Sequence, residues 1–185
     1  MVDMNTRRYI ISTRDMVFTA LFAAVLCAVA PFSIPIGLVP LSLATLVIYI
    51  AAGTLDWRFA VVSTFLYVML GAVGVPVFSN FEGGFHKIAG VTGGFIIGYI
   101  PCSLAASFVF TVFRKKLGAY VCGMIIGTLL LYSCGTAWFI LQTGSTLPTA
   151  LALCVTPFLP GDAMKIILAC FIAPQMRKAL ARSGR

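Results

Sequence analysis

The segment GGFIIGYIPCSLAASFVFTVF, residues 93–113, carries no charge and runs directly into the basic sequence Arg114-Lys115-Lys116. About 20 mostly apolar residues are needed for a helix to cross the hydrocarbon core of a bilayer. Short loops rich in Lys and Arg next to such helices stay on the cytoplasmic side. This stretch therefore predicts a membrane-spanning helix whose C-terminal end lies inside the cell.

The rest of the chain has the same apolar character. Hydrophobic residues make up 61% of the 185 residues, charged residues make up 10%, and the mean hydropathy is +1.05. A soluble domain carries about 25% charged residues, so the composition excludes a soluble protein. We predict an all-α membrane protein that forms one domain over residues 1–185, with six transmembrane helices at about 16–34, 40–55, 56–75, 93–113, 118–142 and 161–174.

The basic residues predict the orientation of these helices. All Lys and Arg residues except Lys87 and Lys165 fall in four groups, and enough apolar sequence for two crossings separates each group from the next. The positive-inside rule then places both termini in the cytoplasm, as a basic arm over 1–15 and a basic tail over 176–185. Because this topology explains the net charge of +8, we expect no nucleic-acid partner. The four groups are Arg7, Arg8 and Arg14; Arg58; Arg114, Lys115 and Lys116; and Arg177, Lys178, Arg182 and Arg185.

Asp162 and Lys165 are charged residues next to an apolar span, where charge is costly and usually marks a functional site. Pro160-Gly161 breaks the chain, and Asp is a favoured N-cap, so we expect Asp162 to start the last helix. Lys165 follows three residues later, on the same helical face. Together with the free N–H groups of a helix N-terminus, the pair suits a small zwitterionic or carboxylate-bearing ligand. An internal ion pair with Asp162 acting merely as a cap fits the spacing equally well.

Residues 143–160 are apolar but are interrupted by Pro148, Pro157 and Pro160. We expect a short helix against the outer face, followed by an unwound segment over residues 157–161. Irregular backbone at membrane depth is tolerated only where it is buried in protein or lines a cavity. The segment before the last helix therefore predicts a cavity.

Residues 76–92 form a long Gly-rich loop on the outer side, between the third and fourth predicted helices. Phe78 offers apolar surface, and the amide of Asn80 is both a donor and an acceptor that suits an amide or urea edge. Such loops on rigid helices act as lids or binding loops, although an ordinary solvated connector fits as well. His86, the single histidine, reads as loop surface rather than as a catalyst or metal ligand.

Small residues recur at four-residue spacing in three of the predicted helices. Such stripes let helices approach each other closely. Packing inside the bundle explains the glycine pairs, whereas the alanines also suit docking on an external partner. The alanine stripe consists of Ala20, Ala24 and Ala28, and the glycine pairs are Gly94 with Gly98 and Gly123 with Gly127.

The sequence also lacks the motifs of several functional classes. Its six cysteines are scattered singly without metal-ligand spacing. It has no phosphate-binding loop, no Ser-His or Cys-His arrangement, and no series of acidic residues within the spans for proton coupling. We therefore expect no enzyme, no metal and no cofactor, but a substrate-capture subunit that depends on a partner for energy.

Three further motifs, beside the alanine stripe, resemble the BioY family of biotin-specific substrate-capture subunits, the S components of energy-coupling-factor (ECF) vitamin transporters. Residues 71–79, GAVGVPVFS, resemble the stretch that follows the third helix in this family. Residues 90–95, GVTGGF, resemble its Gly-Pro-Thr-Gly-Gly-Tyr motif, with Val91 and Phe95 as departures. Residues 157–165, PFLPGDAMK, resemble its Pro-Phe-x-Pro-Gly-Asp-x-x-Lys motif, the most specific of the three.

The resemblance implies a six-helix bundle in the cytoplasmic membrane of a prokaryote that captures biotin with high affinity from outside, under the loop between helices three and four. It implies ligand contacts from Asn80, Asp162 and Lys165, and leaves open whether Lys165 meets the carboxylate or the ureido carbonyl of biotin. Further contacts are assigned to Phe78, Gly94, Tyr132 and Trp138.

The same resemblance implies that the alanine stripe docks on a transmembrane coupling subunit, the T component, driven by two ATP-binding cassette ATPases. Transport then follows from tilting of the loaded subunit in the membrane. The alternatives are an S component for another vitamin and a stand-alone secondary transporter for small solutes. A membrane enzyme is the weakest, because Asp162 and Lys165 lack a third group that activates water.

Overall fold

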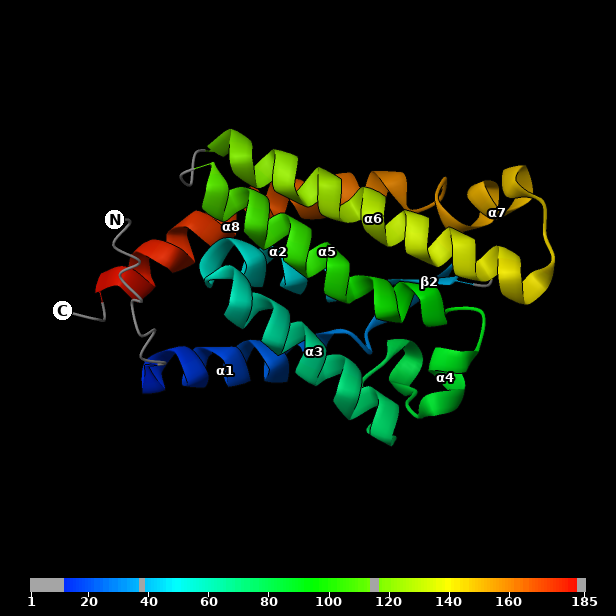
Figure 1. Cartoon of the computed structure of the whole chain (residues 1–185), viewed down its shortest axis with the longest axis horizontal. Helices are drawn as coiled ribbons and strands as arrows, with labels where there is room; N and C mark the ends of the chain where they lie inside the picture. Colours follow the sequence, from blue (N-terminus) through cyan, green and yellow to red (C-terminus); the bar gives the residue numbers. More distant parts are fainter. Residues whose placement is uncertain (1–11, 37–38, 114–116, 183–185) are drawn as a thin grey trace, which may run out of the picture.

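The computed structural model describes residues 12–36, 39–113 and 117–182. Long helices make up most of this part of the chain (Figure 1). They are α1 (Thr13–Val29), α2 (Ala44–Thr54), α3 (Trp57–Val73), α5 (Gly93–Val112), α6 (Leu117–Thr143) and α8 (Leu159–Arg182). The shorter elements are β1 (Ser33–Ile36), β2 (Val39–Ser42), the 3-10 turn η1 (Ser79–Phe81), α4 (Phe85–Ala89) and α7 (Leu147–Cys154).

Each long helix falls within or overlaps one of the six predicted spans, but the helices differ in length. By length and composition, Gly93–Val112 and Gly118–Thr143 are apolar enough to cross a membrane within the described part of the chain. The pair Leu147–Cys154 and Leu159–Leu180, bent by 48°, counts as a third if it forms one broken span. Helix α2 has 11 residues and therefore rises about 16 Å, well short of the ~30 Å hydrocarbon core. The molecule is a mostly helical membrane protein.

The predicted helices at 16–34 and 40–55 are too long, because a β-hairpin separates them. Strands β1 and β2 pair antiparallel, with Ser33 opposite Ser42 and Pro35 opposite Pro40. Proline lacks an N–H and restricts the residue before it to extended backbone, which stops a helix however apolar its neighbours are. The hairpin leads directly into α2, where the Ala44 amide donates to Ser42 Oγ at 3.1 Å.

The segment before the last helix is more regular than predicted. The expected short helix is present as α7, but the break after it covers residues 155–158 rather than 157–161. Pro160 and Gly161 lie in the first turn of α8, where the missing N–H of proline has no helical partner to lose. The prediction that Asp162 starts the helix is wrong, because its amide already donates to Phe158 O at 2.8 Å.

Glycines bring α5 and α6 into close contact, which confirms that the glycine pairs serve packing. A Cβ added at Gly123 would lie 2.7 Å from the carbonyl oxygen of Ala106. One added at Gly127 would lie 2.9 Å from the carbonyl oxygen of Cys102. Backbone at such close range excludes any side chain, so these positions set the distance between the two helices.

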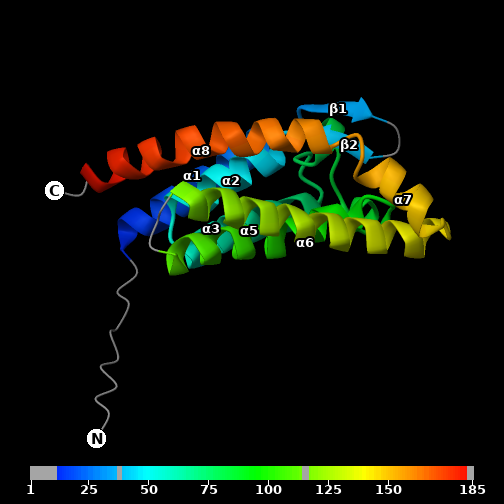
Figure 2. The ribbon, with the colours of Figure 1, turned by 90° about the horizontal axis from the view of Figure 1, so that it is seen from above.

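The two ends of the bundle differ. The hairpin, α4 and α7 lie at one end, and the start of α1, the α2–α3 junction and the end of α8 lie toward the other (Figures 1 and 2). Arg14, Arg58 and Arg177 belong to these latter segments. Arg7, Arg8, Arg114, Lys115, Lys116 and Arg185 lie outside the described residues.

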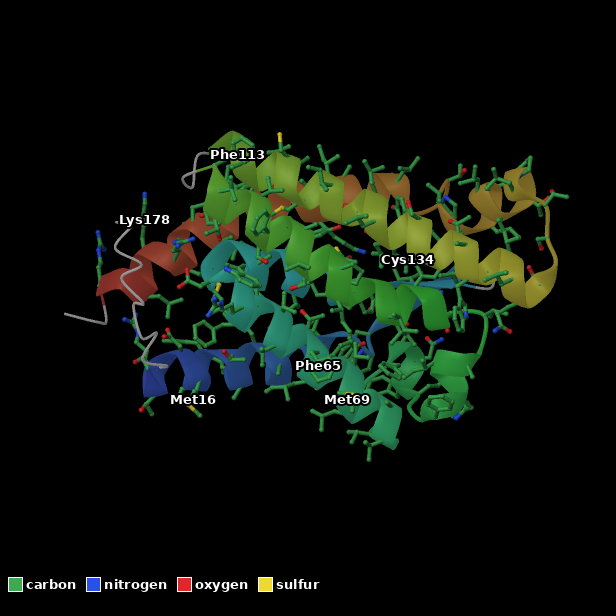
Figure 3. The ribbon with its side chains drawn as sticks, viewed as in Figure 1. Met16, Phe65, Met69, Phe113, Cys134 and Lys178 are labelled. Carbon is green, nitrogen blue, oxygen red and sulfur yellow. The ribbon has the colours of Figure 1, made fainter. Side chains whose placement is uncertain are left out.

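Apolar side chains cover much of the outer surface, as expected for a protein surrounded by lipid. Met16 of α1 and Phe65 and Met69 of α3 point away from the bundle, with exposed fractions of 59%, 47% and 46% (Figure 3). Lys178 belongs to the C-terminal part of α8, and it lies at the end of the bundle opposite the hairpin in the same view.

Candidate ligand-binding site

Two adjoining cavities open between the hairpin, the loop from α3 to α5, and the helices α5, α6 and α8. The outer compartment, beneath that loop, has a volume of about 280 Å³. The inner compartment is about 40 Å³ and reaches Asp162 and Lys165 on α8. Four residues line both compartments and so join them into one site: Val39, Pro40, Phe95 and Tyr99.

The inner compartment contains a buried ion pair. Asp162 and Lys165 are 5% and 6% exposed, and Lys165 Nζ lies 2.9 Å from Asp162 Oδ1. The Tyr132 hydroxyl donates to the other carboxylate oxygen, Oδ2, at 2.5 Å. These distances confirm that Asp162 and Lys165 share one face of the last helix.

The ammonium group of Lys165 has no donor to spare. Beside Asp162, it donates to the Ser42 carbonyl at 2.7 Å and to Thr45 Oγ1 at 3.0 Å. An ammonium group has three N–H donors, whereas a carboxylate offers about four acceptor positions. Asp162 can therefore accept further N–H groups from a ligand, but Lys165 must give up a partner to contact one.

The outer compartment has an aromatic wall. Phe78 is 3% exposed and meets the Tyr67 ring edge to face, with the ring centroids 5.8 Å apart. Gly71 makes this possible, since a Cβ there would lie 2.2 Å from the Phe78 ring. The wall suits an apolar ring system of a ligand.

Asn80 lines the outer compartment and fastens the loop to the hairpin. Its backbone is left-handed, with φ 63°, which Asn tolerates better than most residues. Its backbone N–H donates to the carbonyl oxygen of Pro31 at 3.0 Å. Its side-chain oxygen Oδ1 accepts a hydrogen bond from Ser33 Oγ, also at 3.0 Å. The side chain therefore couples residues far apart in the sequence.

The rim of the outer compartment carries charge. Glu82 and Lys87 form an ion pair there, and the exposed His86 lines the same compartment. The predicted placement of His86 on the loop surface is confirmed, although it also borders the cavity.

Hydrogen bonds hold the second half of the loop at Gly84 and at Gly90, which favours a folded lid over a solvated connector. The Gly84 amide donates to Gly71 O at 2.7 Å. At the other end, Trp138 Nε1 donates to Gly90 O at 2.9 Å. Gly94 lies behind this contact, because a Cβ there would lie 2.2 Å from the Cβ of Trp138.

Two of the predicted ligand contacts do not border the site, and their role as ligand contacts stays a prediction. Gly94 and Trp138 are not among the described residues that line the two compartments. They support the lid instead. Trp138 occupies the space that a side chain at position 94 would fill, and from there its indole donates a hydrogen bond to Gly90 O. Asn80, Phe78, Tyr132, Asp162 and Lys165 do line the site.

Residues 4–182 match the model of the BioY family. The chain belongs to the BioY family. A biotin transporter, BioY2, from Lactococcus lactis is 31% identical over 98% of this chain and 97% of its own length. The biotin transporter BioY of Thermotoga maritima is 30% identical over 89% and 96% of the two chains. In three dimensions the chain is similar to the crystal structure of an S component for biotin from an ECF-type ABC transporter, with a TM-score of 0.83 and 24% identity over 89% of this chain and 91% of that one.

This BioY-family chain exposes its alanine stripe. Ala20, Ala24 and Ala28 lie on the outer face of α1, while Phe22 and Leu26 on the opposite face are buried. The stripe is therefore exposed on the surface of the described bundle.

Sequence reasoning missed the residues that complete the ion-pair cluster in this BioY-family site. Ser42 and Thr45 contact Lys165 from 123 and 120 residues away. Tyr99, which borders both compartments, lies in the uninterrupted apolar segment of α5. Pro35 and Pro40 were the available signal, because prolines at these positions argue against a continuous helix and for a loop.

Proposed function

We propose that this chain captures biotin at the hairpin end of the bundle and takes it across the cytoplasmic membrane of a prokaryote as the S component of an ATP-driven ECF transporter. The observation that carries the proposal is the buried Asp162–Lys165–Tyr132 cluster at the bottom of the two-compartment cavity. Membership in the BioY family, whose compared relatives are named biotin transporters, supports biotin as the ligand.

The cluster suits the ureido ring of biotin, which presents two N–H donors and one carbonyl acceptor. Asp162 has acceptor positions left for an N–H group, and a hydrogen bond to a carboxylate is stronger than one between neutral groups. The apolar thioether ring would lie against the wall that Phe78 and Tyr67 form. Asn80 borders the outer compartment and can contact the same ligand through its amide group.

The proposed topology has six crossings with both termini inside. Helices α1, α3, α5, α6 and α8 cross the membrane, and α2 completes the second crossing together with the hairpin. Arg14 of α1, Arg58 of α3 and Arg177 of α8 belong to segments at the end opposite the cavity, as the positive-inside rule requires if biotin enters from outside.

The proposed energy source is external to the chain. A T component would dock on Ala20, Ala24 and Ala28, and two ATP-binding cassette ATPases would drive the loaded subunit to tilt. Small exposed residues at four-residue spacing allow the close helix approach that such docking needs. The chain itself would catalyse no reaction.

Titration of biotin into the purified protein in detergent, by calorimetry, tests this proposal. Asp162→Asn and Lys165→Met should each weaken binding about 30-fold or more, because removing one partner of a buried charge pair costs about 2–5 kcal/mol. Asp56→Asn is the matched control, since this carboxylate lies 4.0 Å from Arg177 toward the other end of the bundle.

A thermal melt of each variant separates loss of binding from loss of folding. Should the single variants unfold, the double variant Asp162→Asn/Lys165→Met removes both charges and avoids leaving one buried and unpaired. Folded wild-type protein that does not bind biotin would disprove the assignment, and titrations with other vitamins would then test the alternative S components.

A further inference from the structure

We propose that Lys87, on the rim of the outer compartment, recognises the carboxylate of the ligand and makes the site selective for an anionic tail. The inference rests on the proposed function and extends it to a residue outside the motifs compared above. Lys87 and Lys165 are the two lysines among the described residues that line the joined compartments. One of them is the natural partner of a carboxylate, and their surroundings decide between them.

The positive charge of Lys165 is already neutralised by Asp162. Its three donors are taken by Asp162 Oδ1, Ser42 O and Thr45 Oγ1, at 2.9, 2.7 and 3.0 Å. A ligand carboxylate placed there would displace one of these groups and add a negative charge beside Asp162. Burying a charge without full compensation is strongly unfavourable. The inner compartment therefore favours the neutral, N–H-bearing end of the ligand.

Lys87 has the opposite surroundings. Its side chain is 32% exposed and its ion-pair partner Glu82 is 43% exposed, so neither group is locked in place by burial. A partly exposed ion pair of this kind contributes little net free energy, because water still reaches both partners. Lys87 can therefore leave Glu82, or keep it as a neighbour, and donate to a ligand carboxylate at small cost.

The loop presents Lys87 at a defined position. Lys87 lies in α4, whose start is held by the Gly84–Gly71 hydrogen bond of 2.7 Å. The end of the same segment is held by Trp138 through Gly90 at 2.9 Å. A cation held on a supported segment loses less conformational entropy when it binds a ligand than one on a free loop does.

The order of the compartments fits an elongated ligand. The inner compartment contains the acceptor, Asp162, and the outer one has apolar walls and ends at the charged rim. A ligand with a urea-like ring at one end and a carboxylate on an apolar chain at the other presents its groups in the same order. Glu82, as a competing anion next to Lys87, would limit the affinity and favour release.

The experiment compares biotin with its methyl ester, which lacks the anionic charge, on wild type and Lys87→Met. We expect wild type to bind biotin about tenfold more tightly than the ester, as is typical of one hydrogen bond to a charged group. Lys87→Met should bind both ligands equally, with the affinity for the ester unchanged. Glu82→Gln should bind biotin several-fold more tightly than wild type does, because the competing anion is gone.

Lys178→Met, in the C-terminal part of α8 and outside the residues that line the two compartments, is the charge-matched control and should keep the wild-type preference. If Lys87→Met still prefers biotin tenfold, the proposal is wrong and another group of the site recognises the carboxylate. If wild type binds biotin and the ester equally well, no residue recognises the negative charge of the carboxylate, and the proposal is wrong. A wild-type protein that binds neither compound would instead overturn the proposed function, and this inference with it.

Discussion

The hydroxyl of Tyr132 makes a single, short hydrogen bond to Asp162, and its removal isolates that contact. Tyr132→Phe leaves Oδ2 of a buried carboxylate without the donor at 2.5 Å. Because hydrogen bonds to charged groups contribute about 1.5–3 kcal/mol, we expect a comparable loss of unfolding free energy. We also expect weaker biotin binding, since the carboxylate is no longer held in position. Thermal melts and calorimetric titration in detergent measure the two effects.

Tyr49→Phe is the control for this prediction. The Tyr49 hydroxyl lies 2.7 Å from Thr128 Oγ1, and Tyr49 is fully buried but does not line the site. We expect this variant to lose about 1 kcal/mol of stability and to bind biotin as wild type does. Equal losses of binding in both variants would show that general loosening, rather than the Asp162 contact, weakens the site.

Spacing along one helix predicted the contact between Asp162 and Lys165, because residues three apart on a helix share a face. It did not predict the partners of the pair. Ser42, Thr45 and Tyr132 come from other elements, and no local pattern relates their positions to α8. The expected N-cap role of Asp162 was wrong, because α8 begins at Leu159, three residues before Asp162.

The contact between α5 and α6 depends on glycine at position 94. Gly94→Ala would place a Cβ 2.2 Å from Trp138 Cβ and 2.7 Å from Cys134 O, so the helices would have to separate. Overpacking of this kind costs about 1–3 kcal/mol, and we expect a lower melting temperature. Gly118→Ala, with nothing within 4 Å of its added Cβ, should be neutral or stabilising by up to ~1 kcal/mol. Equal melting temperatures would contradict the packing argument.

The indole of Trp138 joins α6 to the lid. Trp138→Phe keeps most of the apolar surface but removes the hydrogen bond to Gly90 O. We expect faster amide hydrogen exchange over residues 85–91 and faster release of biotin, because the loop opens more often. Trp57→Phe, at the start of α3 toward the opposite end, should change neither rate. Unchanged exchange in the Trp138 variant would mean that other contacts hold the lid.

The long helices were predicted from the sequence more accurately than the β-hairpin was. Apolar runs located α5 and α6 almost to the residue, since a run of about 20 such residues has few alternatives to a helix. The β-hairpin was missed and α2 is shorter than predicted, because apolar content alone does not distinguish a strand from a helix. The prolines at positions 35 and 40 were the signal that mattered, and they stand opposite each other in the register.

A substitution on the outward face of α1 should impair transport without changing ligand binding, because the proposed docking uses this face. Ala24→Trp adds a large side chain to the exposed stripe, on the face of α1 opposite the buried Phe22 and Leu26. We expect unchanged biotin affinity in detergent but biotin uptake at background level in cells that express the complete transporter. Ile126→Trp is the matched control, because Ile126 is 43% exposed on α6 and should face lipid. Normal uptake by the Ala24 variant would place the partner elsewhere.

The sequence by itself determined that the chain is a helical membrane protein, where its long helices lie, and that Asp162 and Lys165 form a pair. These features follow from local rules, because apolar length, glycine spacing and helical periodicity act over a few turns. Tertiary structure alone decided that hairpin, lid and three helices enclose one cavity, that Trp138 supports the lid from behind, and that Lys165 is satisfied while Lys87 stays available. Those properties depend on which distant backbone and side-chain groups meet, and hydrogen-bond partners more than 100 residues apart leave no periodic pattern in the chain.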